Sequence, residues 1–275
     1  MGRLRRLDAE LVRRGLARSR QHAAELVAAG RVSVSGRPAA KAATQVATAD
    51  PVVVAGAPTG PEYVGRGAHK LAGALDAFAD VVVEGRRCLD AGASTGGFTD
   101  VLLRRGAAHV VAVDVGYGQL AWSLRSDDRV TVLDRTNVRE LRPEQVAPAP
   151  GLVVADLSFI SLRLVLPALK ACAVPDADLL LMVKPQFEVG RERLGSGGVV
   201  REAGHRADAV VAVGMAAAEL GLTPVGVVAS PLPGPSGNVE YFLRLRSGAA
   251  EPETALAAMV DEAVLAGPTG ASVRR

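Results

Sequence analysis

From Arg86 onward, short apolar runs alternate with stretches of helical composition, and this alternation most restricts the fold of the 275-residue chain. The pattern is typical of a parallel sheet with helices packed on both of its faces. We expect seven strands, near residues 87–90, 109–114, 130–133, 152–156, 178–184, 224–229 and 239–245. The sequence therefore predicts an α/β fold built on a doubly wound sheet.

A glycine-rich turn follows the first predicted strand. From Asp90 to Thr99 it reads Asp-Ala-Gly-Ala-Ser-Thr-Gly-Gly-Phe-Thr, which lets the backbone approach a nucleotide-like ligand closely. Asp114 ends the second predicted strand, where a carboxylate can hold both ribose hydroxyls of a nucleoside. The glycine spacing differs from the dinucleotide pattern Gly-x-Gly-x-x-Gly, so an adenosine without phosphates is favoured. The glycines could instead serve only the tight packing of a helix on its strand. Asp114 could instead be a simple helix cap.

Four ionisable residues stand where a doubly wound sheet places its ligand-binding edge. Asp156 and Lys184 end the fourth and fifth predicted strands, so their side chains emerge at the carboxyl edge. Glu240 begins the seventh strand and shares that edge if this strand runs antiparallel to the others. Lys70 lies on a helix that is predicted to begin near Ala68. We expect the four side chains to meet, and surface or structural ion pairs are the alternative.

The first sixty residues have a composition of their own. They contain ten Lys and Arg against four Asp and Glu, a net charge of +6, whereas the whole chain carries +3. Leucines at helical spacing, beginning with Leu4, predict a helix that ends at Gly15, and a second helix is expected over residues 20–29. Strands are expected near residues 32–34 and 51–54.

The composition also excludes several classes of protein. The two cysteines, Cys88 and Cys172, lie far apart without metal-ligand spacing, so neither a disulfide framework nor a metal site is expected. No apolar run reaches the about 18 residues of a membrane span, and no signal peptide is evident. We expect a cytoplasmic protein that has no metal and no membrane partner.

The front module resembles the S4 RNA-binding domain. The resemblance is carried by Leu7-Asp8, Gly15-Leu16-Ala17, Ser19-Arg20, Gly30 and Gly36. It implies phosphate contacts from Arg18, Arg20 and Arg31, and it places Leu7, Leu11 and Leu26 in the core. The local positive charge adds Arg5, Arg6 and Arg14 as candidate RNA contacts. A solvated helix face is the alternative for these arginines.

Taken with this module, the motifs of the remaining chain resemble those of the TlyA family. They are Gly65-Arg66-Gly67-Ala68-His69-Lys70, the turn from Asp90 to Thr99, Lys184-Pro185-Gln186-Phe187-Glu188 and Pro235-Ser236-Gly237-Asn238. The resemblance implies a Rossmann-like, seven-stranded class I methyltransferase domain preceded by a small α+β S4 domain. The implied reaction transfers a methyl group from S-adenosylmethionine to the ribose 2′-hydroxyl of cytidines in 16S or 23S ribosomal RNA, or in both, within ribosomal subunits.

The implied domain organisation has four parts. They are an S4-like domain over residues 1–60, a linker over 61–64, the methyltransferase domain over 65–247, and a C-terminal helix with a mobile tail over 248–275.

The four edge residues resemble the Lys-Asp-Lys-Glu tetrad of ribose 2′-O-methyltransferases. Lys184 is the candidate base for the 2′-hydroxyl proton, and a lysine serves as a base only where burial or a second cation disfavours its ammonium form. Lys70 is the candidate cation, and Asp156 and Glu240 are expected to orient the two amines. The candidate cofactor-binding residues are Asp90, Gly92, Ser94, Thr95, Gly96, Gly97, Phe98, Asp114, Asp134 and Asn137.

For some residues, and for the function itself, the sequence leaves alternatives open. Asp134 and Asn137 follow the third predicted strand and could contact adenine or cap the next turn. Phe159 and Phe187 could stack on the target base or the cofactor, or pack in the core. A base N-methyltransferase is disfavoured because Asp156 is followed by Leu-Ser-Phe rather than by the Pro-Pro-Tyr or Pro-Pro-Phe typical of that class. A non-catalytic ribosome assembly factor and a haemolysin-like activity are the rival functions.

Overall fold

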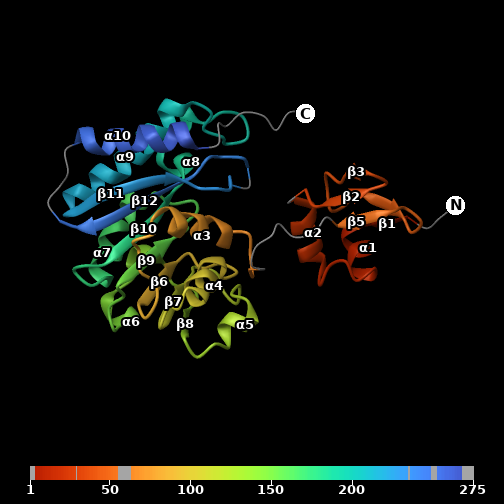
Figure 1. The fold of residues 1–275 in the computed structure, drawn as a ribbon, viewed down its shortest axis with the longest axis horizontal. Helices are drawn as coiled ribbons and strands as arrows, with labels where there is room; N and C mark the ends of the chain where they lie inside the picture. Colours follow the sequence, from red (N-terminus) through yellow and green to blue (C-terminus); the bar gives the residue numbers. More distant parts are fainter. Residues whose placement is uncertain (1–3, 29, 55–62, 235, 249–252, 268–275) are drawn as a thin grey trace. The chain divides into compact units, whose positions relative to one another are not determined.

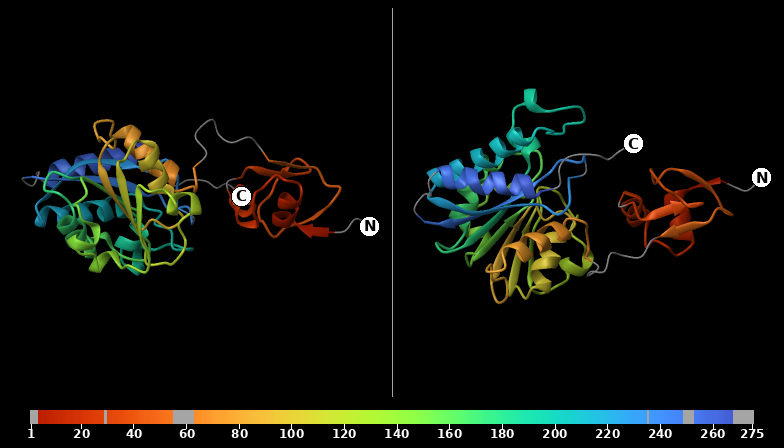
Figure 2. Two further views of the ribbon diagram at one scale, coloured as in Figure 1. Left: turned by 90° about the horizontal axis from the view of Figure 1, so that it is seen from below. Right: turned by 45° about the horizontal axis from the view of Figure 1, so that its top comes forward.

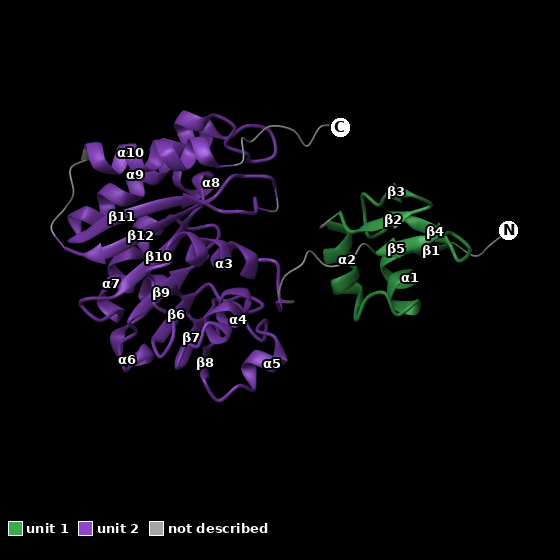
Figure 3. Cartoon of the chain, viewed as in Figure 1, with its two compact units in different colours: residues 1–62 green, residues 63–275 purple. Residues whose placement is uncertain are grey.

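The structure is a computed structural model that describes residues 4–28, 30–54, 63–234, 236–248 and 253–267. The chain divides into two compact units, residues 1–62 and residues 63–275, which Figure 3 shows in different colours. Residues 61 and 62 of the predicted linker, and the predicted mobile tail after residue 267, lie outside the described residues.

Over its described residues, the first unit consists of two helices and two small antiparallel sheets. Its elements are β1 Leu4–Arg6, α1 Leu7–Arg13, α2 Arg20–Ala28, β2 Val32–Val34, β3 Arg37–Pro38, β4 Gln45–Ala47 and β5 Val52–Val54. β1 pairs with β4, and β2 pairs with both β3 and β5. Leu7, Leu11 and Leu26 are buried between these elements, as expected. The two helices and the strands β2 and β5 confirm the sequence prediction.

The placement of Leu4 in the first helix was wrong. Leu4 lies in β1 opposite Ala47 of β4, and its side chain is exposed. The helix begins instead at Leu7, whose N–H donates to the carbonyl of Thr44. Because this pairing involves a segment about forty residues later, helical spacing around Leu4 gave no sign of it.

The second unit is built on a seven-stranded sheet with the strand order β11-β12-β10-β9-β6-β7-β8 (Figure 1). The strands are β6 Arg87–Ala91, β7 His109–Val113, β8 Val130–Leu133, β9 Leu152–Ala155, β10 Asp178–Val183, β11 Leu222–Ala229 and β12 Tyr241–Ser247. Strands β6 to β10 pair in parallel, whereas β12 runs antiparallel to both β10 and β11. The seven predicted strands and the reversed last strand are confirmed.

Helices cover both faces of this sheet (Figure 2). They are α3 Ala68–Ala77, α4 Gly97–Arg104, α5 Trp122–Arg125, α6 Pro143–Val146, α7 Leu166–Cys172, α8 Pro185–Glu188, α9 Ala203–Glu219 and α10 Glu253–Ala266, with short 3₁₀ turns at η1 Val138–Glu140, η2 Leu162–Leu164 and η3 Arg191–Arg193. Helix α10 confirms the predicted C-terminal helix.

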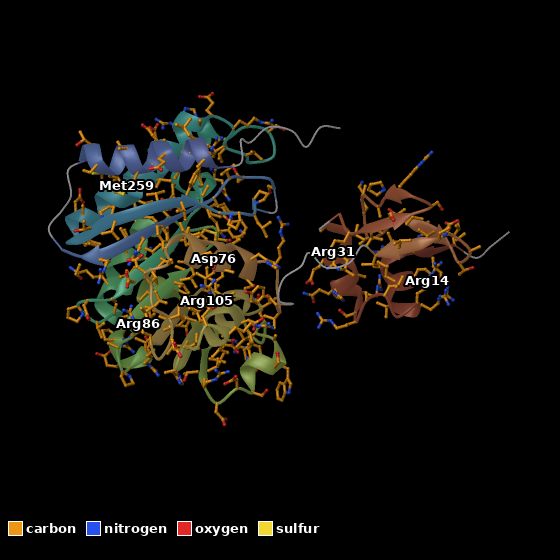
Figure 4. All side chains as sticks on the ribbon, in the orientation of Figure 1. Arg14, Arg31, Asp76, Arg86, Arg105 and Met259 are labelled. Carbon is orange, nitrogen blue, oxygen red and sulfur yellow. The ribbon has the colours of Figure 1, made fainter. Side chains whose placement is uncertain are left out.

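The two faces of the sheet form separate hydrophobic clusters because successive side chains of a strand point to opposite sides. In β6, Cys88 packs in the cluster with α3 and α4, and Leu89 packs in the cluster with α7, α9 and α10. An ion pair between Arg105 and Asp76, both labelled in Figure 4, joins the end of α4 to α3. In the described parts of the chain, no helix has the length and apolar character needed to cross a membrane.

Candidate active site

Four ionisable side chains from separate elements meet at the edge of the sheet where the parallel strands end. Lys70 lies on α3, and Asp156 and Lys184 directly follow β9 and β10. Glu240 directly precedes β12, whose reversed direction places its beginning at the same edge. The structure thus brings together the four residues that the sequence singled out.

These residues form two ion pairs. Lys70 Nζ lies 2.5 Å from Glu240 Oε2, and Lys184 Nζ lies 2.6 Å from Asp156 Oδ1. Each carboxylate therefore holds one amine, as the sequence led us to expect. Lys70 was also expected to disfavour the ammonium form of Lys184. The structure pairs Lys70 directly with Glu240, and its predicted effect on Lys184 stays a prediction.

Glu240 is held through both of its carboxylate oxygens. Oε2 accepts a hydrogen bond from Lys70 Nζ, and Oε1 accepts one from Gln186 Nε2 at 3.3 Å. A Cβ atom on Gly234 would lie 2.5 Å from Oε1, so the backbone can approach the carboxylate this closely only at a glycine. Sequence reasoning missed Gln186 and Gly234, although Gln186 follows Lys184 in a motif that was already noted.

Lys184 makes a second contact that the sequence analysis left out. Its Nζ donates a hydrogen bond to Ser158 Oγ at 2.8 Å. Asp156 Oδ1 is nearer, but the direction of that contact does not satisfy hydrogen-bond geometry, so it is a charge pair. The signal for Ser158 was its position two residues after an aspartate that ends a strand.

A cavity of about 250 Å³ opens beside these groups, and Lys70, Asp156, Ser158 and Lys184 form part of its wall. The predicted cofactor-binding residues that line it are Gly92, Ser94, Thr95, Gly97 and Phe98. The two ion pairs and the glycine-rich turn therefore face one common space.

The turn itself needs glycine at two positions. Gly92 and Gly96 have φ angles of 87° and 97°, in the left-handed region that glycine adopts without strain. A Cβ on Gly92 would also lie 2.6 Å from the carbonyl oxygen of Asp156. Close packing accounts for both glycines, and it brings the turn against the strand end that carries Asp156.

Asp114 has an arrangement that suits a ribose. Its Oδ2 accepts a hydrogen bond from the N–H of Ser94 at 2.8 Å, and its Oδ1 accepts one from the N–H of Gly116 at 2.7 Å. Each carboxylate oxygen can accept a further hydrogen bond. The backbone thus fixes the carboxylate and leaves acceptor capacity for two hydroxyl groups.

Asp90 lies beneath the turn and is fully buried. Its Oδ2 accepts a hydrogen bond from Thr99 Oγ1 at 2.7 Å, whereas Oδ1 has no hydrogen-bond partner among the described residues. Burial, aided by the nearby charges of Asp156 and Asp114, raises the pKa of Asp90 to about 7. Asp90 therefore supports the turn from below instead of lining the cavity.

Asp134 and Asn137 have local partners. Asp134 Oδ2 accepts from Arg125 Nη2 at 2.8 Å, and Asn137 Oδ1 accepts from the N–H of Arg139 at the start of η1. The capping alternative thus describes Asn137 in the structure, and a contact between either residue and adenine stays a prediction.

Phe159 and Phe187 lie beside each other, with ring centroids 5.2 Å apart. Phe159 is 91% exposed, which excludes core packing for this residue. Its φ angle of 65° is unusual for a residue with a side chain. Stacking of this ring on a base stays a prediction.

Of the arginines predicted to contact RNA, Arg14 (labelled in Figure 4) is occupied within the first unit. It forms an ion pair with Glu10, and its guanidinium donates to the carbonyls of Asp50 and Thr48, each at 2.9 Å. These contacts join the end of α1 to the segment between β4 and β5. Arg14 therefore helps to hold the fold of the first unit.

The other candidate arginines are either exposed or only partly buried. Arg6 and Arg20 both pair with Asp8 and keep 46% and 60% of their side chains exposed. Arg18 is exposed, whereas Arg5 and Arg31 are partly buried. Arg18 and Arg20 therefore offer the accessible positive charge that phosphate contacts need.

Comparisons with known proteins agree with the two-part organisation. The family described as FtsJ-like methyltransferase matches residues 63–247, and the S4 domain family matches residues 5–52. The chain is 65% identical to the 16S/23S rRNA (cytidine-2′-O)-methyltransferase TlyA of Mycobacterium tuberculosis over 90% of this chain and 91% of that protein.

Two further relatives cover nearly the whole chain. YqxC of Bacillus subtilis is 42% identical over 94% of this chain and 93% of its own length. A solved structure from Streptococcus thermophilus, described as a hemolysin, is 36% identical, covers 96% of both chains and superposes with a TM-score of 0.74. The similarity thus extends through both compact units.

Proposed function

Since this chain belongs to the TlyA family of S4-domain, FtsJ-like rRNA methyltransferases, we propose that it methylates the ribose 2′-hydroxyl of cytidines in ribosomal RNA. The observation that carries this proposal is the meeting of Lys70, Asp156, Lys184 and Glu240 in two ion pairs beside one cavity. A ribose hydroxyl is a weak nucleophile, so a catalyst must position its oxygen and accept its proton. The cluster offers amines and carboxylates suited to both tasks.

The residues around the cavity fit S-adenosylmethionine as the methyl donor. The glycine-rich turn allows a close approach to the methionine part, and Asp114 has free acceptor capacity for two ribose hydroxyls. The turn follows a pattern other than that of dinucleotide-binding proteins, which suits a nucleoside without phosphates. When bound, this cofactor supplies a methyl group already activated by its sulfonium.

Lys184 is the group we assign to proton removal. Lys184 first releases to water the proton that makes it a cation in the resting ion pair. The O–H bond of the ribose hydroxyl then breaks, and its proton restores the third N–H bond on Lys184 Nζ. The deprotonated oxygen would then be the acceptor for the methyl group that a bound cofactor would supply. Asp156, 2.6 Å from Nζ, stabilises the ammonium that results.

Lys70 and Glu240 have a different task in this proposal. Their mutual contact and the hydrogen bond from Gln186 to Glu240 hold Lys70 in place in the cavity wall. A charged amine held beside the cavity can donate to the ribose oxygens and so keep the sugar in line with the methyl group. Lys70 therefore acts as a positioning group and not as a base, because its amine is already paired with Glu240.

The first unit supplies RNA binding. Exposed Arg18 and Arg20 lie on a module that matches the S4 domain family and carries a local charge of +6. Phosphate contacts of this type attach a protein to RNA with little dependence on base sequence. We propose that assembled ribosomal subunits, in which the rRNA is folded, are the substrate.

The test is methyl transfer from S-adenosylmethionine labelled in its methyl group to purified 30S and 50S subunits. Nuclease digestion followed by mass spectrometry should show 2′-O-methylcytidine. A methylated base, or transfer to ribose on other nucleosides, would contradict the proposed reaction. Binding to subunits without any transfer would favour the assembly-factor alternative.

A further inference from the structure

We propose that Ser158 is a positioning residue that directs the amine of Lys184 toward the ribose hydroxyl, a role that rests on the proposed function. Ser158 lines the same cavity as Lys184, and its Oγ accepts a hydrogen bond from Lys184 Nζ at 2.8 Å. Ser158 is an exposed residue that lines the cavity, so its hydroxyl borders the space proposed for the substrate.

Ser158 supplies a directional contact that Asp156 lacks. Asp156 Oδ1 lies 2.6 Å from Nζ, but the angles at that contact do not meet hydrogen-bond geometry. A charge pair attracts the amine without fixing its rotation, whereas a hydrogen bond favours one direction of the N–H bond. The rotation of the Lys184 amine is therefore set largely by the serine hydroxyl.

The segment that carries Ser158 is anchored at both ends. At its start, the N–H of Asp156 donates to the carbonyl of Ala91 at 3.0 Å. At its end, Glu188 accepts a hydrogen bond from Ser161 Oγ at 2.6 Å and another from the N–H of Leu162 at 2.7 Å.

Glu188 is well placed to hold this segment, because its side chain is only 1% exposed. Burial raises the pKa of Glu188, although its hydrogen bonds from Ser161 and Leu162 oppose that effect. Helix α8, which ends at Glu188, begins directly after Lys184. The same short helix thus fixes the serine-bearing segment and the lysine, so the distance between Ser158 and Lys184 is determined by one local structure.

The chemistry explains why a hydroxyl is useful at this position. A neutral amine has two N–H bonds and one lone pair. Because Ser158 Oγ takes up one of these N–H bonds, one direction of the amine is fixed and the lone pair occupies one of the two that remain. Proton uptake then adds an N–H bond along the lone pair and leaves the Ser158 hydrogen bond in place, so the amine need not rotate during the reaction.

Replacing Ser158 by alanine and by threonine tests this role. In single-turnover reactions with saturating cofactor and subunits, Ser158→Ala should reduce the rate about 10–100-fold, as expected for a lost hydrogen bond to a charged group. Cofactor affinity and the KM for subunits should stay within about twofold, since these depend on other contacts. Ser158→Thr keeps the hydroxyl and should recover the rate to within about threefold of wild type.

Ser161→Ala is the matched control. It removes a serine hydroxyl from the same segment, but the Leu162–Glu188 hydrogen bond remains. We expect its rate to stay within about threefold of wild type. Thermal unfolding of all three variants checks that each one folds.

Three results would overturn the role of Ser158. They are an unchanged rate for Ser158→Ala, a threonine variant no better than alanine, and equal losses for Ser158→Ala and Ser161→Ala. An inactive wild-type protein would instead overturn the proposed function, and this role with it. The two failures are therefore distinguishable by the wild-type measurement.

Discussion

Lys70 and Glu240 are separated by 170 positions in the sequence, yet Lys70 Nζ and Glu240 Oε2 lie 2.5 Å apart. The two side chains are 8% and 1% exposed. A charge at such a position is stabilised mainly by its partner, because water cannot solvate it. The contact therefore links α3, which precedes the sheet in the chain, to the start of β12, which is the last strand of the sheet in chain order.

Removing one partner of this pair should destabilise the protein more than removing both. Lys70→Met leaves Glu240 buried without its counter-charge, and such a loss typically costs about 3–5 kcal/mol. The double variant Lys70→Met/Glu240→Leu should be more stable than Lys70→Met alone. Urea unfolding of the two single variants and the double variant measures this coupling, and additive effects would contradict it.

Lys184 should be required for the chemical step. Lys184→Ala should lower the single-turnover rate by about 10²–10⁴, the usual contribution of a positioned base, and should spare folding and cofactor affinity. Lys184→Arg should not restore the rate, because a guanidinium stays protonated at any usable pH. A largely active arginine variant would show that Lys184 acts through its charge alone.

Asp114 should contribute to cofactor affinity. Asp114→Ala removes acceptors from the position predicted for the ribose, and cofactor binding should weaken by about 1.5–3 kcal/mol. Isothermal titration calorimetry with S-adenosylhomocysteine measures the change. Asp134→Ala is a useful comparison, since Arg125 already occupies that carboxylate. Equal affinity of wild type and Asp114→Ala would remove Asp114 from the cofactor site.

Asp90 should make stability fall as pH rises. Burial raises the pKa of Asp90 from 3.8 to about 7 in the folded protein. The folded state therefore holds this proton more tightly than the unfolded state, and the resulting stability is complete below about pH 4 and lost by about pH 7. The shift corresponds to an effect on the order of 4 kcal/mol.

The comparison that isolates this effect uses Asp90→Asn, which cannot ionise. Urea unfolding at pH 5 and pH 8 should show that wild type loses more stability than Asp90→Asn between these two values. Parallel pH dependences of the two proteins would mean that Asp90 ionises normally in the folded state.

Arg18 and Arg14 should differ in what they contribute to RNA binding. Arg18→Gln should weaken RNA binding and lower the slope of log affinity against log salt by about one, as expected for one lost phosphate contact. Arg14→Gln should instead lower the melting temperature of the first unit, because Arg14 binds the carbonyls of Thr48 and Asp50. A salt slope that does not change for Arg18→Gln would exclude it from the phosphate contacts.

Much of the second unit could be predicted because its signals are local. Apolar runs mark the strands, and the ends of parallel strands share an edge, so residue order alone was enough to place Asp156 and Lys184 together. From the sequence, Glu240 was expected at this edge only if β12 ran antiparallel to the other strands. The structure shows that β12 is reversed, and this reversal brings Glu240 to the edge.

Other features depend on contacts that the sequence does not show. The pairing of Leu4 with Ala47 requires two short segments to meet across the first unit, and nothing near Leu4 indicates it. The hydrogen bond from Lys184 to Ser158 depends on the path of a loop after β9, which Glu188 fixes from another helix. Residue type and spacing alone could not supply that path.

The pairing of charges at the cavity bears on how the capture of RNA and the transfer of the methyl group are divided between the two units. Two cations and two anions cancel within contact distance, so these four side chains contribute little long-range attraction. In the proposed function, electrostatic steering of a polyanion is therefore the task of the arginine-bearing unit, and it sets how often RNA arrives. If the proposed function holds, the arrival frequency of RNA and the speed of the bond-making step are set by different parts of the chain, and each can change in evolution without altering the other.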